Sequence, residues 1–481
     1  MLLLEQIVAV ISIGNVMLAA VLIFMERRNI AATWAWLMVL LFLPGIGFIV
    51  YLIFGQKLSK KKLYRLKEGE FSHFRTAVDK QKYLLENGKL EVNDPAMERH
   101  RDMIYMNVVS DGAYYTQDNA IKVFLEGNSL FADMFGQIEK AQEHIHLLYY
   151  TIRNDELGSE LMNILVKKAS EGVQVRLLYD AVGSAGIPSR FFKPLLAAGG
   201  EVVPFFPASF SFINFRVNFR NHRKLTIVDG KIGYLGGFNI GDEYVGKKKL
   251  GYWRDTHLRI EGKAVYMLQA RFFLDWNLSS PKRMAEAITY FPETHGPADG
   301  IGVQIVSSGP NSEKHQILHA YLKMIYKARQ TIYLQTPYFI PDESILTALK
   351  MAVMSGVDVR VMVPGKPDHL MVFWATHSYL GELLKSGVRC YLYEKGFMHA
   401  KTIVVDTQIS SVGTANIDIR SFKLNFETNA YLYDTRIAEK LEELFIADLA
   451  DCRELTIEEY MNRPLRSRIQ ESLTRLLSPI F

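Results

Sequence analysis

The sequence predicts an α/β protein of two fused, pseudo-symmetric halves, with helices covering mainly buried sheets and a transmembrane helical hairpin at the N-terminus. Three observations predict this fold class. Two long apolar runs occupy the first 56 residues, two similar segments follow, and each segment contains one copy of the same polar motif. In both segments, apolar runs bounded by glycine-marked turns alternate with helical patterns, which is typical of buried strands covered by helices.

The composition is that of a folded protein. The chain has 481 residues, of which 49% are hydrophobic and 22% are charged, so a largely disordered chain is excluded. Two cysteines, Cys390 and Cys452, are too few for a disulfide framework and indicate a reducing compartment for most of the chain. The net charge of +5 is too small to indicate nucleic acid as a partner, and it is compatible with an anionic membrane surface.

Residues 1–56 are predicted to form two transmembrane helices, at about residues 7–25 and 31–54. A helix of about 20 apolar residues spans the hydrocarbon of a bilayer, and the short link at residues 26–30 favours a hairpin. A cleaved signal peptide is disfavoured, because Glu5 replaces the basic start that such peptides have. A hairpin buried in a protein core is the competing interpretation.

A basic juxtamembrane linker is predicted over residues 57–106. Six lysines and arginines lie between residues 57 and 67, whereas the hairpin loop has only Arg27 and Arg28. The positive-inside rule therefore places the C-terminal part of the chain in the cytoplasm. The same cluster can contact anionic headgroups or serve only as a stop-transfer flank.

The rest of the chain repeats itself with a period near 180 residues. Residues 141–150 resemble residues 328–337, and residues 172–179 resemble residues 356–363. This period is too long for a solenoid and predicts a first half over residues 107–295 and a second half over residues 296–481.

The two halves differ in one insertion, at residues 204–219 of the first half. Its phenylalanines predict a lipid-facing rim, with an internal packing loop as the alternative. The six phenylalanines are Phe205, Phe206, Phe210, Phe212, Phe215 and Phe219.

The C-terminus is predicted to form an amphipathic helix. From Leu465 to Ile480 the apolar residues fall on one helical face, and Arg466, Arg468 and Arg475 lie elsewhere. A helix of this kind either lies on a membrane or packs on its own domain.

The repeated polar motif is His-x-Lys-x4-Asp. The first copy contains His222, Lys224 and Asp229, and the second contains His399, Lys401 and Asp406. Each copy is followed by a Gly-x-x-Asn sequence, which ends at Asn239 in one half and at Asn416 in the other. Two copies with matching offsets indicate a shared site rather than surface residues.

The residue types suit a phosphate group. Residues i and i+2 of a strand lie on the same face, so each histidine is predicted beside its lysine. If the halves pack with two-fold pseudo-symmetry, two lysines and two asparagines surround one anion. One histidine can then attack phosphorus while the other protonates the leaving oxygen.

The two motif aspartates have a second interpretation. Asp229 and Gly230 form a favourable two-residue hairpin turn, and Asp406 and Thr407 are its counterpart. We keep both aspartates in the candidate catalytic set, and the turn position favours a structural role for them.

These paired motifs resemble those of the phospholipase D superfamily. The whole chain looks most similar to the bacterial cardiolipin synthases of the two-transmembrane type. That resemblance includes the hairpin with Trp34 and Trp36, the sequence Tyr-Trp-Arg-Asp-Thr-His from Tyr252, and residues 335–341.

The resemblance implies transfer of a phosphatidyl group between two phosphatidylglycerol molecules, giving cardiolipin and glycerol. It implies His222 as the nucleophile and His399 as the general acid, although the symmetry of the motifs leaves that order open. It also implies that Asn239 and Asn416, together with the two lysines, hold the phosphate oxygens.

The resemblance further implies no metal and no cofactor, and the partners are phosphatidylglycerol and cardiolipin in the bacterial inner (cytoplasmic) membrane. No nucleic acid and no obligatory protein partner are inferred. His144 and His146 share a strand face, but no nearby cysteine or carboxylate completes a zinc site.

Two further carboxylates follow the Gly-x-x-Asn sequences. By resemblance each orients the histidine of the opposite half, which pairs Glu427 with His222 and Asp255 with His399. Salt bridges to neighbouring arginines are the alternative. Two other functions also remain: a membrane-bound phospholipase D that hydrolyses phospholipid to phosphatidic acid, and a non-catalytic membrane scaffold.

Overall fold

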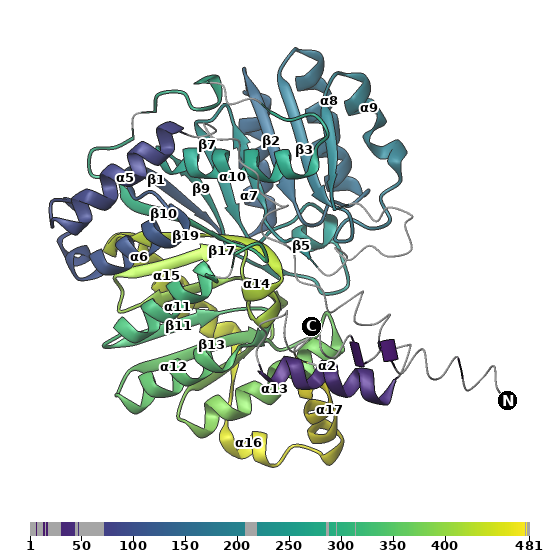
Figure 1. Cartoon of the computed structure of the whole chain (residues 1–481), viewed down its shortest axis with the longest axis vertical. Helices are drawn as coiled ribbons and strands as arrows, with labels where there is room; N and C mark the ends of the chain where they lie inside the picture. Colours follow the sequence, from purple (N-terminus) through teal and green to yellow (C-terminus); the bar gives the residue numbers. More distant parts are fainter. Residues whose placement is uncertain are drawn as a thin grey trace.

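The two halves share one continuous sheet, which Figure 1 shows running through the length of the molecule. The computed structural model describes residues 30–43, 72–206, 219–284, 288–294, 296–312 and 314–476, with a few isolated positions outside these ranges. The first half contributes strands β1 (Thr116–Phe124), β2 (His144–Tyr149), β3 (Gln174–Asp180), β4 (Glu201–Phe205), β6 (Leu225–Val228), β7 (Ile232–Gly236) and β9 (His257–Glu261). The second half contributes β10 (Ile301–Ser308), β11 (Thr331–Gln335), β13 (Asp358–Pro364), β14 (Arg389–Tyr393), β16 (Thr402–Val405), β17 (Ile409–Gly413), β19 (Asn425–Tyr433) and β20 (Cys452–Leu455).

Strand order reveals the pseudo-symmetry. Outward from the boundary between the halves, the first half has the order β1-β9-β7-β6-β2-β3-β4. The second half has β10-β19-β17-β16-β11-β13-β14-β20, which repeats the same order and adds one strand. The predicted α/β fold of two similar halves is therefore confirmed.

Backbone hydrogen bonds join the halves directly. β1 and β10 are antiparallel, with Thr116 opposite Val303, and β10 pairs on its other side with β19 from Gly302 to Ser308. Because β10 pairs with a strand of each half, the boundary is part of one sheet and not a flexible connection.

Helices cover both faces of this sheet. The first half has α7 (Gly127–Glu139), α8 (Glu156–Ser170), α9 (Lys193–Ala197) and α10 (Ala264–Ser279). The second half has α11 (Gln316–Lys327), α12 (Glu343–Met354), α13 (Leu370–Lys385), α14 (Ile419–Lys423), α15 (Thr435–Asp448), α16 (Ile457–Met461) and α17 (Leu465–Leu476). α10 and α15 share one apolar core that contains Leu235, Leu268, Ala430 and Leu441, so this core also extends across both halves.

Part of the predicted linker is instead folded into the second half. α5 (Ser72–Glu86) and the 3₁₀ helix η1 (Pro95–His100) lie within residues 57–106. α6 (Arg101–Asp111) begins within this range and ends beyond it. Met97, Met103 and Ile104 are completely buried and belong to the same core as α11 and α12. The linker prediction was wrong for residues 72–106, because it weighed the basic residues and overlooked these apolar ones.

The transmembrane hairpin stays a prediction. The run at residues 7–25 lies almost wholly outside the described residues, and of the run at 31–54 the structure describes chiefly α2 (Ile30–Phe42). Within the described ranges, no helix combines the length and the apolar character needed to cross a bilayer.

The phenylalanine insertion is only partly described. Phe205, Phe206 and Phe219 are at most 5% exposed, and the first two pack against Phe426 of β19. These three side chains belong to the core, so the prediction of a lipid-facing rim was wrong for them. The other three phenylalanines lie outside the described residues.

Candidate active site

Short parallel ladders between the halves place the two motif histidines. β5 (Arg220–Asn221) pairs with the first residues of β19, and the next residue, His222, donates its N–H to the carbonyl of Phe426 at 2.9 Å. In the other half, β15 (Phe397–Met398) pairs with β8 (Trp253–Arg254). The following residue, His399, donates its N–H to the carbonyl of Arg254 at 2.7 Å.

Each ladder aligns a histidine with a carboxylate of the opposite half. Glu427 directly follows Phe426, and its two oxygens lie 3.0 and 3.1 Å from Nδ1 of His222. Asp255 directly follows Arg254, and its Oδ2 lies 2.6 Å from Nδ1 of His399. The structure therefore makes the two contacts that the sequence suggested, and it leaves Nε2 of each ring for chemistry.

Other groups hold the Glu427 carboxylate in place. The hydroxyl of Thr414 donates to Oε2 at 2.5 Å, and the side-chain amide of Asn425 donates to Oε1 at 3.2 Å. Burial alone would raise the pKa of Glu427, but His222 and then Lys224 outweigh burial and hold that pKa below its usual value. The carboxylate is thus charged and fixed.

Both lysines are buried beside their histidines. Lys224 is 0% exposed and Lys401 is 1% exposed, and each Nζ donates to the backbone carbonyl of the histidine two residues earlier at 2.5 Å. Burial and the charge of Lys401 lower the pKa of Lys224 to about 7. Burial lowers the pKa of Lys401 to about 8. An anion between these lysines would favour their charged forms.

The two motifs are electrostatically coupled, which indicates that they meet in one site. Burial lowers the pKa of His222, and the charge of Lys401 from the other half lowers it further. Burial and Lys401 lower the pKa of His399 to about 4, and Lys224 contributes from across the halves. Both histidines are therefore neutral at neutral pH in the unliganded site.

The two asparagines are buried and held by neighbouring polar groups. Oδ1 of Asn239 accepts the N–H of Thr151 at 3.1 Å, and its amide donates to the Tyr244 hydroxyl at 2.9 Å. The amide of Asn416 donates to Asp418 at 3.1 Å. A side-chain amide has two N–H donors, and each of these bonds uses one of them.

The motif aspartates occupy the hairpin turns that the sequence indicates. Asp229 has φ +50° and accepts the backbone N–H groups of Gln142, Glu143 and His144 at 2.8–2.9 Å. Asp406 has φ +54° and likewise accepts the N–H groups of residues 329–331. Each carboxylate joins its turn to the start of the neighbouring strand, which supports a structural role.

His144 and His146, the pair considered as zinc ligands, contact a side-chain amide. Both rings lie 3.2 Å from Oε1 of Gln269, and His146 stacks on Phe272. No group of three potential metal ligands occurs among the residues that the structure describes.

The structure adds residues to the site that the sequence reasoning did not select. An aromatic ring contacts each histidine: Tyr150 lies 4.9 Å from His222 and Trp253 lies 5.1 Å from His399, between ring centroids. The internal repeat could not reveal these contacts, because the two rings come from non-equivalent positions: Tyr150 follows β2, and Trp253 lies in β8.

The sequence reasoning also did not select Arg223, whose side chain contacts residues of both halves next to the site. It is 1% exposed, and it contacts Asp275 of α10 at 2.5 Å and the Thr428 hydroxyl at 2.8 Å. It also donates to the carbonyl of Glu427 at 3.2 Å. Only the position of Arg223 inside the first motif could have indicated its role, because the second motif has Ala400 there.

A glycine makes room for the second carboxylate. A Cβ atom at Gly237 would lie 2.0 Å from Oδ1 of Asp255, far inside contact distance. The equivalent position in the other half is Thr414, whose hydroxyl binds Glu427 instead. Gly237, the second residue of the first Gly-x-x-Asn sequence, therefore has a steric reason in this fold.

Known proteins are similar to this chain in sequence and in fold. A family model described as "Cardiolipin synthase, PLD-like domain" matches residues 134–268 and 321–449, and one described as "Phospholipase_D-nuclease N-terminal" matches residues 13–56. A cardiolipin synthase of Listeria innocua serovar 6a is 51% identical over 480 residues, which is 99% of each chain. The major cardiolipin synthase ClsA of Bacillus subtilis (strain 168) is 51% identical and covers 97% of each chain.

A solved structure shows the same fold at low sequence identity. The phosphatidylserine synthase of Haemophilus influenzae Rd KW20 has a TM-score of 0.61 and 15% identity. The similarity covers 79% of this chain and 100% of that chain.

Proposed function

The chain belongs to the cardiolipin synthase family of phospholipase D-like proteins, and on that premise we propose that it joins two phosphatidylglycerol molecules into cardiolipin and glycerol. One observation carries the proposal. Two buried histidines have their Nδ1 atoms held by carboxylates of opposite halves, and each histidine is influenced by the lysine of the other half. A site with this symmetry can form a phosphoenzyme and then discharge it.

In the first step, Nε2 of His222 attacks the phosphorus of one phosphatidylglycerol. The bond from phosphorus to the glycerol headgroup oxygen breaks, and His399 donates a proton to that oxygen, so glycerol leaves. Glu427 supports the attack, because a carboxylate that accepts a hydrogen bond from Nδ1–H keeps the lone pair on Nε2 and stabilises the positive ring. The negative phosphodiester raises the pKa of His399 and thereby favours its acid form.

In the second step, His399 acts as a base. It removes the proton from a headgroup hydroxyl of a second phosphatidylglycerol, whose oxygen attacks phosphorus as the bond to Nε2 of His222 breaks. Cardiolipin and the free enzyme result, with atoms and charge balanced. Asp255 holds His399 in both steps through its Nδ1.

Lysine and asparagine side chains hold the phosphate oxygens that do not react. Lys224 and Lys401 are compact charges on the same site, and an anion there shifts both lysines toward their protonated forms. The second amide N–H of Asn239 and of Asn416 adds a neutral donor. Fixed donors of this kind stabilise charge as the transition state develops.

Phosphatidylglycerol is a membrane lipid, and so the enzyme acts at a membrane. We propose the bacterial inner membrane, with the N-terminal hairpin as a multi-pass anchor and the two-half domain on the cytoplasmic side. The apolar runs of residues 7–25 and 31–54 and the basic residues after them support this placement.

The test is product analysis with the purified full chain in phosphatidylglycerol vesicles. Cardiolipin, glycerol and phosphatidic acid are measured together for the wild type and for His222→Ala and His399→Ala, with the exposed His369→Ala as a matched control. We expect cardiolipin and glycerol in equal amounts, lost in the two site variants and retained in the control. Phosphatidic acid without cardiolipin would instead establish hydrolysis.

The order of the histidines has its own measurement. Rapid quenching with phosphate-labelled phosphatidylglycerol, followed by peptide mapping, locates the covalent phosphoryl group. We expect the label on the peptide of His222. Label on the peptide of His399 would reverse the two roles and leave the overall reaction unchanged.

A further inference from the structure

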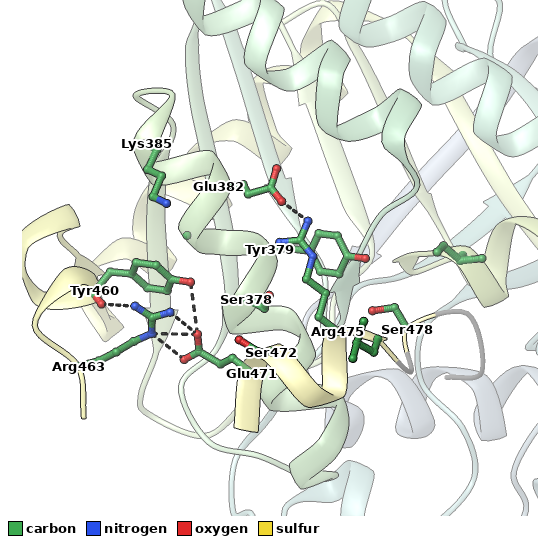
Figure 2. A pocket seen from close by; sticks show the side chains of 13 residues that line it. Ser378, Tyr379, Glu382, Lys385, Tyr460, Arg463, Glu471, Ser472, Arg475 and Ser478 are labelled. Atoms are coloured by element: carbon green, nitrogen blue, oxygen red, sulfur yellow. Dashed lines mark hydrogen bonds and ion pairs between the residues drawn. The ribbon is translucent and has the colours of Figure 1, made fainter. Parts of the chain in front are cut away.

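The C-terminal helix α17 turns its polar side toward its own domain. Glu471 and Thr474 are each 5% exposed, and Glu471 accepts hydrogen bonds from Arg463 at 2.9–3.0 Å. Arg475 forms an ion pair with Glu382 of α13. Figure 2 shows Glu471, Arg463, Arg475 and Glu382 around a cavity of about 550 Å³, which residues of α13 and α17 line. α17 is therefore attached to the domain mainly through charged and hydroxyl groups.

The opposite side of α17 is apolar and exposed. Four side chains form an outer stripe, which consists of Leu465, Ile469, Leu473 and Leu476 with exposures of 69%, 51%, 59% and 78%. Leu476, at the end of the stripe, also borders the cavity. At 3.6 residues per turn these four positions fall within about 80° of the helix circumference. A helix that only packs on a globular domain has the reverse orientation, with its apolar stripe toward the core. The outer stripe therefore needs an occupant that the domain itself does not supply.

Positive charge flanks the outer stripe on both sides. Arg466 and Arg468 are exposed, and helical geometry places one on each side of the stripe. The only acidic residue of α17 is Glu471, which faces inward. An apolar stripe between cationic side chains matches the interface of an anionic bilayer, where the stripe enters the acyl boundary and the arginines reach the phosphates.

We propose that the outer stripe of α17 docks the enzyme domain onto an anionic lipid bilayer. A second copy of the chain fits less well, because a two-fold contact through this stripe would bring the flanking arginines of both copies together. The position of α17 is consistent with the proposal. Along the long axis of the molecule in Figure 1, it lies toward the same end as α2. Trp34 and Phe42 of α2 are 58% and 74% exposed.

Docking through this helix extends the proposed function, and it depends on that function only for the choice of lipid. The substrate headgroups lie in the plane of the bilayer surface, so the active site has to face that surface. A second membrane contact, besides the N-terminal run, would restrict the orientation of the domain relative to the bilayer. Once the N-terminal run holds the chain at the membrane, α17 meets the bilayer at a high effective concentration, so a weak contact is sufficient.

A direct test measures the depth of α17 in the bilayer. Leu473→Cys is made in the full chain with Cys452→Ser, labelled with an NBD fluorophore, and reconstituted into vesicles of equal parts phosphatidylglycerol and phosphatidylcholine. Cys390 is 0% exposed and stays in place. Val109→Cys on α6, where the native side chain is 46% exposed, is the matched control.

Lipids with a nitroxide on the acyl chain should quench the label at residue 473 about two-fold or more over the control. Equal quenching at residues 473 and 109 would overturn the proposal. Cross-linking of residue 473 between copies, without quenching, would also overturn it and identify a second copy as the occupant. Equal quenching in vesicles of phosphatidylcholine alone would overturn the role of the arginines. None of these readouts requires turnover, so a failure of the proposed function is seen separately.

A kinetic test uses charge reversal of equal size at two places. Arg466→Glu with Arg468→Glu should raise KM for vesicle phosphatidylglycerol about ten-fold. The same pair should leave kcat unchanged on short-chain substrate dispersed in detergent. Lys140→Glu with Lys167→Glu, on exposed positions of the first half, changes the net charge equally. An equal rise of KM in both pairs would show a general charge effect and contradict a local docking role.

Discussion

Replacement of Glu427 by glutamine should set the wrong tautomer on the histidine that we propose as nucleophile. The hydroxyl of Thr414 accepts the N–H of Thr428 at 3.0 Å, and its own proton goes to the Glu427 oxygen 2.5 Å away in preference to the more distant Thr428 carbonyl at 3.3 Å. In Glu427→Gln, the amide oxygen has to remain at this hydroxyl. The amide nitrogen then takes the place of Oε1, 3.0 Å from Nδ1 of His222, and donates a hydrogen bond to it. The side-chain amide of Asn425, which donates to Oε1 in the wild type, must rotate in this variant so that its own oxygen accepts from the new amide.

This donation removes the nucleophile rather than merely weakening it. When Nδ1 of His222 accepts a hydrogen bond, the neutral ring carries its proton on Nε2, which then has no lone pair for phosphorus. Replacing the acid of an aspartate–histidine pair by its amide, in a hydrolase of another fold, lowers kcat about 10⁴-fold through the same tautomer change. We expect a loss of about 10³–10⁴-fold here, which corresponds to roughly 4–5.5 kcal/mol in the activation barrier.

The assay is the burst of phosphohistidine in a rapid-quench experiment, followed by the steady-state rate of cardiolipin formation. Glu427→Gln should lose the burst, whereas Asp255→Asn acts on the opposite histidine and should mainly slow the proton transfers. Thermal unfolding of each variant in mild detergent, compared with that of the wild type, verifies that the variant is folded. A folded Glu427→Gln enzyme that keeps more than about a tenth of the wild-type rate would refute the tautomer argument.

Three further predictions concern groups around the site. Because unfolded Lys224 keeps its proton up to a pKa near 10.5 and the folded residue loses it near 7, the free energy of unfolding should rise by about 2 kcal/mol between pH 7 and 9, and Lys224→Met should remove that rise in denaturant titrations. Arg223→Met should cost about 3–5 kcal/mol in the same titrations, because the buried Asp275 carboxylate loses its cationic partner, and a double variant with Asp275→Leu should recover most of this loss. A loss below about 1 kcal/mol in the single variant would contradict a buried ion pair. Gly237→Ala should lower kcat by about 10²-fold or more, since its Cβ displaces the carboxylate that orients the second histidine; Gly136→Ala in α7, where a Cβ meets nothing within 4 Å, should not, and equal rates in the two variants would rule out the steric argument.

Local patterns were sufficient to predict the two halves and their polar motifs. Apolar runs such as residues 402–405 and 225–228 are short, bounded by turn residues and duplicated, and the structure makes β16 and β6 of them. The turn at Asp229 and Gly230 was also predictable, because both residues have positive φ values that aspartate and glycine tolerate.

Contacts between distant segments set the limit of that reasoning. Glu427 and His222 are separated by 205 residues, and their contact depends on the two-residue ladder between β5 and β19. So short a ladder has no periodicity to recognise, and only the family resemblance suggested the pair. The burial of α6 against the second half was missed for a related reason, since nothing local shows which core accepts its apolar residues.

The placement of Glu427 on β19 bears on how the protein is made. A ribosome that adds about 5–20 residues per second reaches this residue some 10–40 s after it has added His222. During that interval the first half completes its own motif, but β19, which carries Glu427 and pairs with both β10 and β5, is still missing from the sheet. Under the proposed mechanism, a nascent or prematurely released chain has no orienting carboxylate for its nucleophile. Synthesis thus delays activity until the chain is almost finished, and incomplete copies in the membrane leave its lipids untouched.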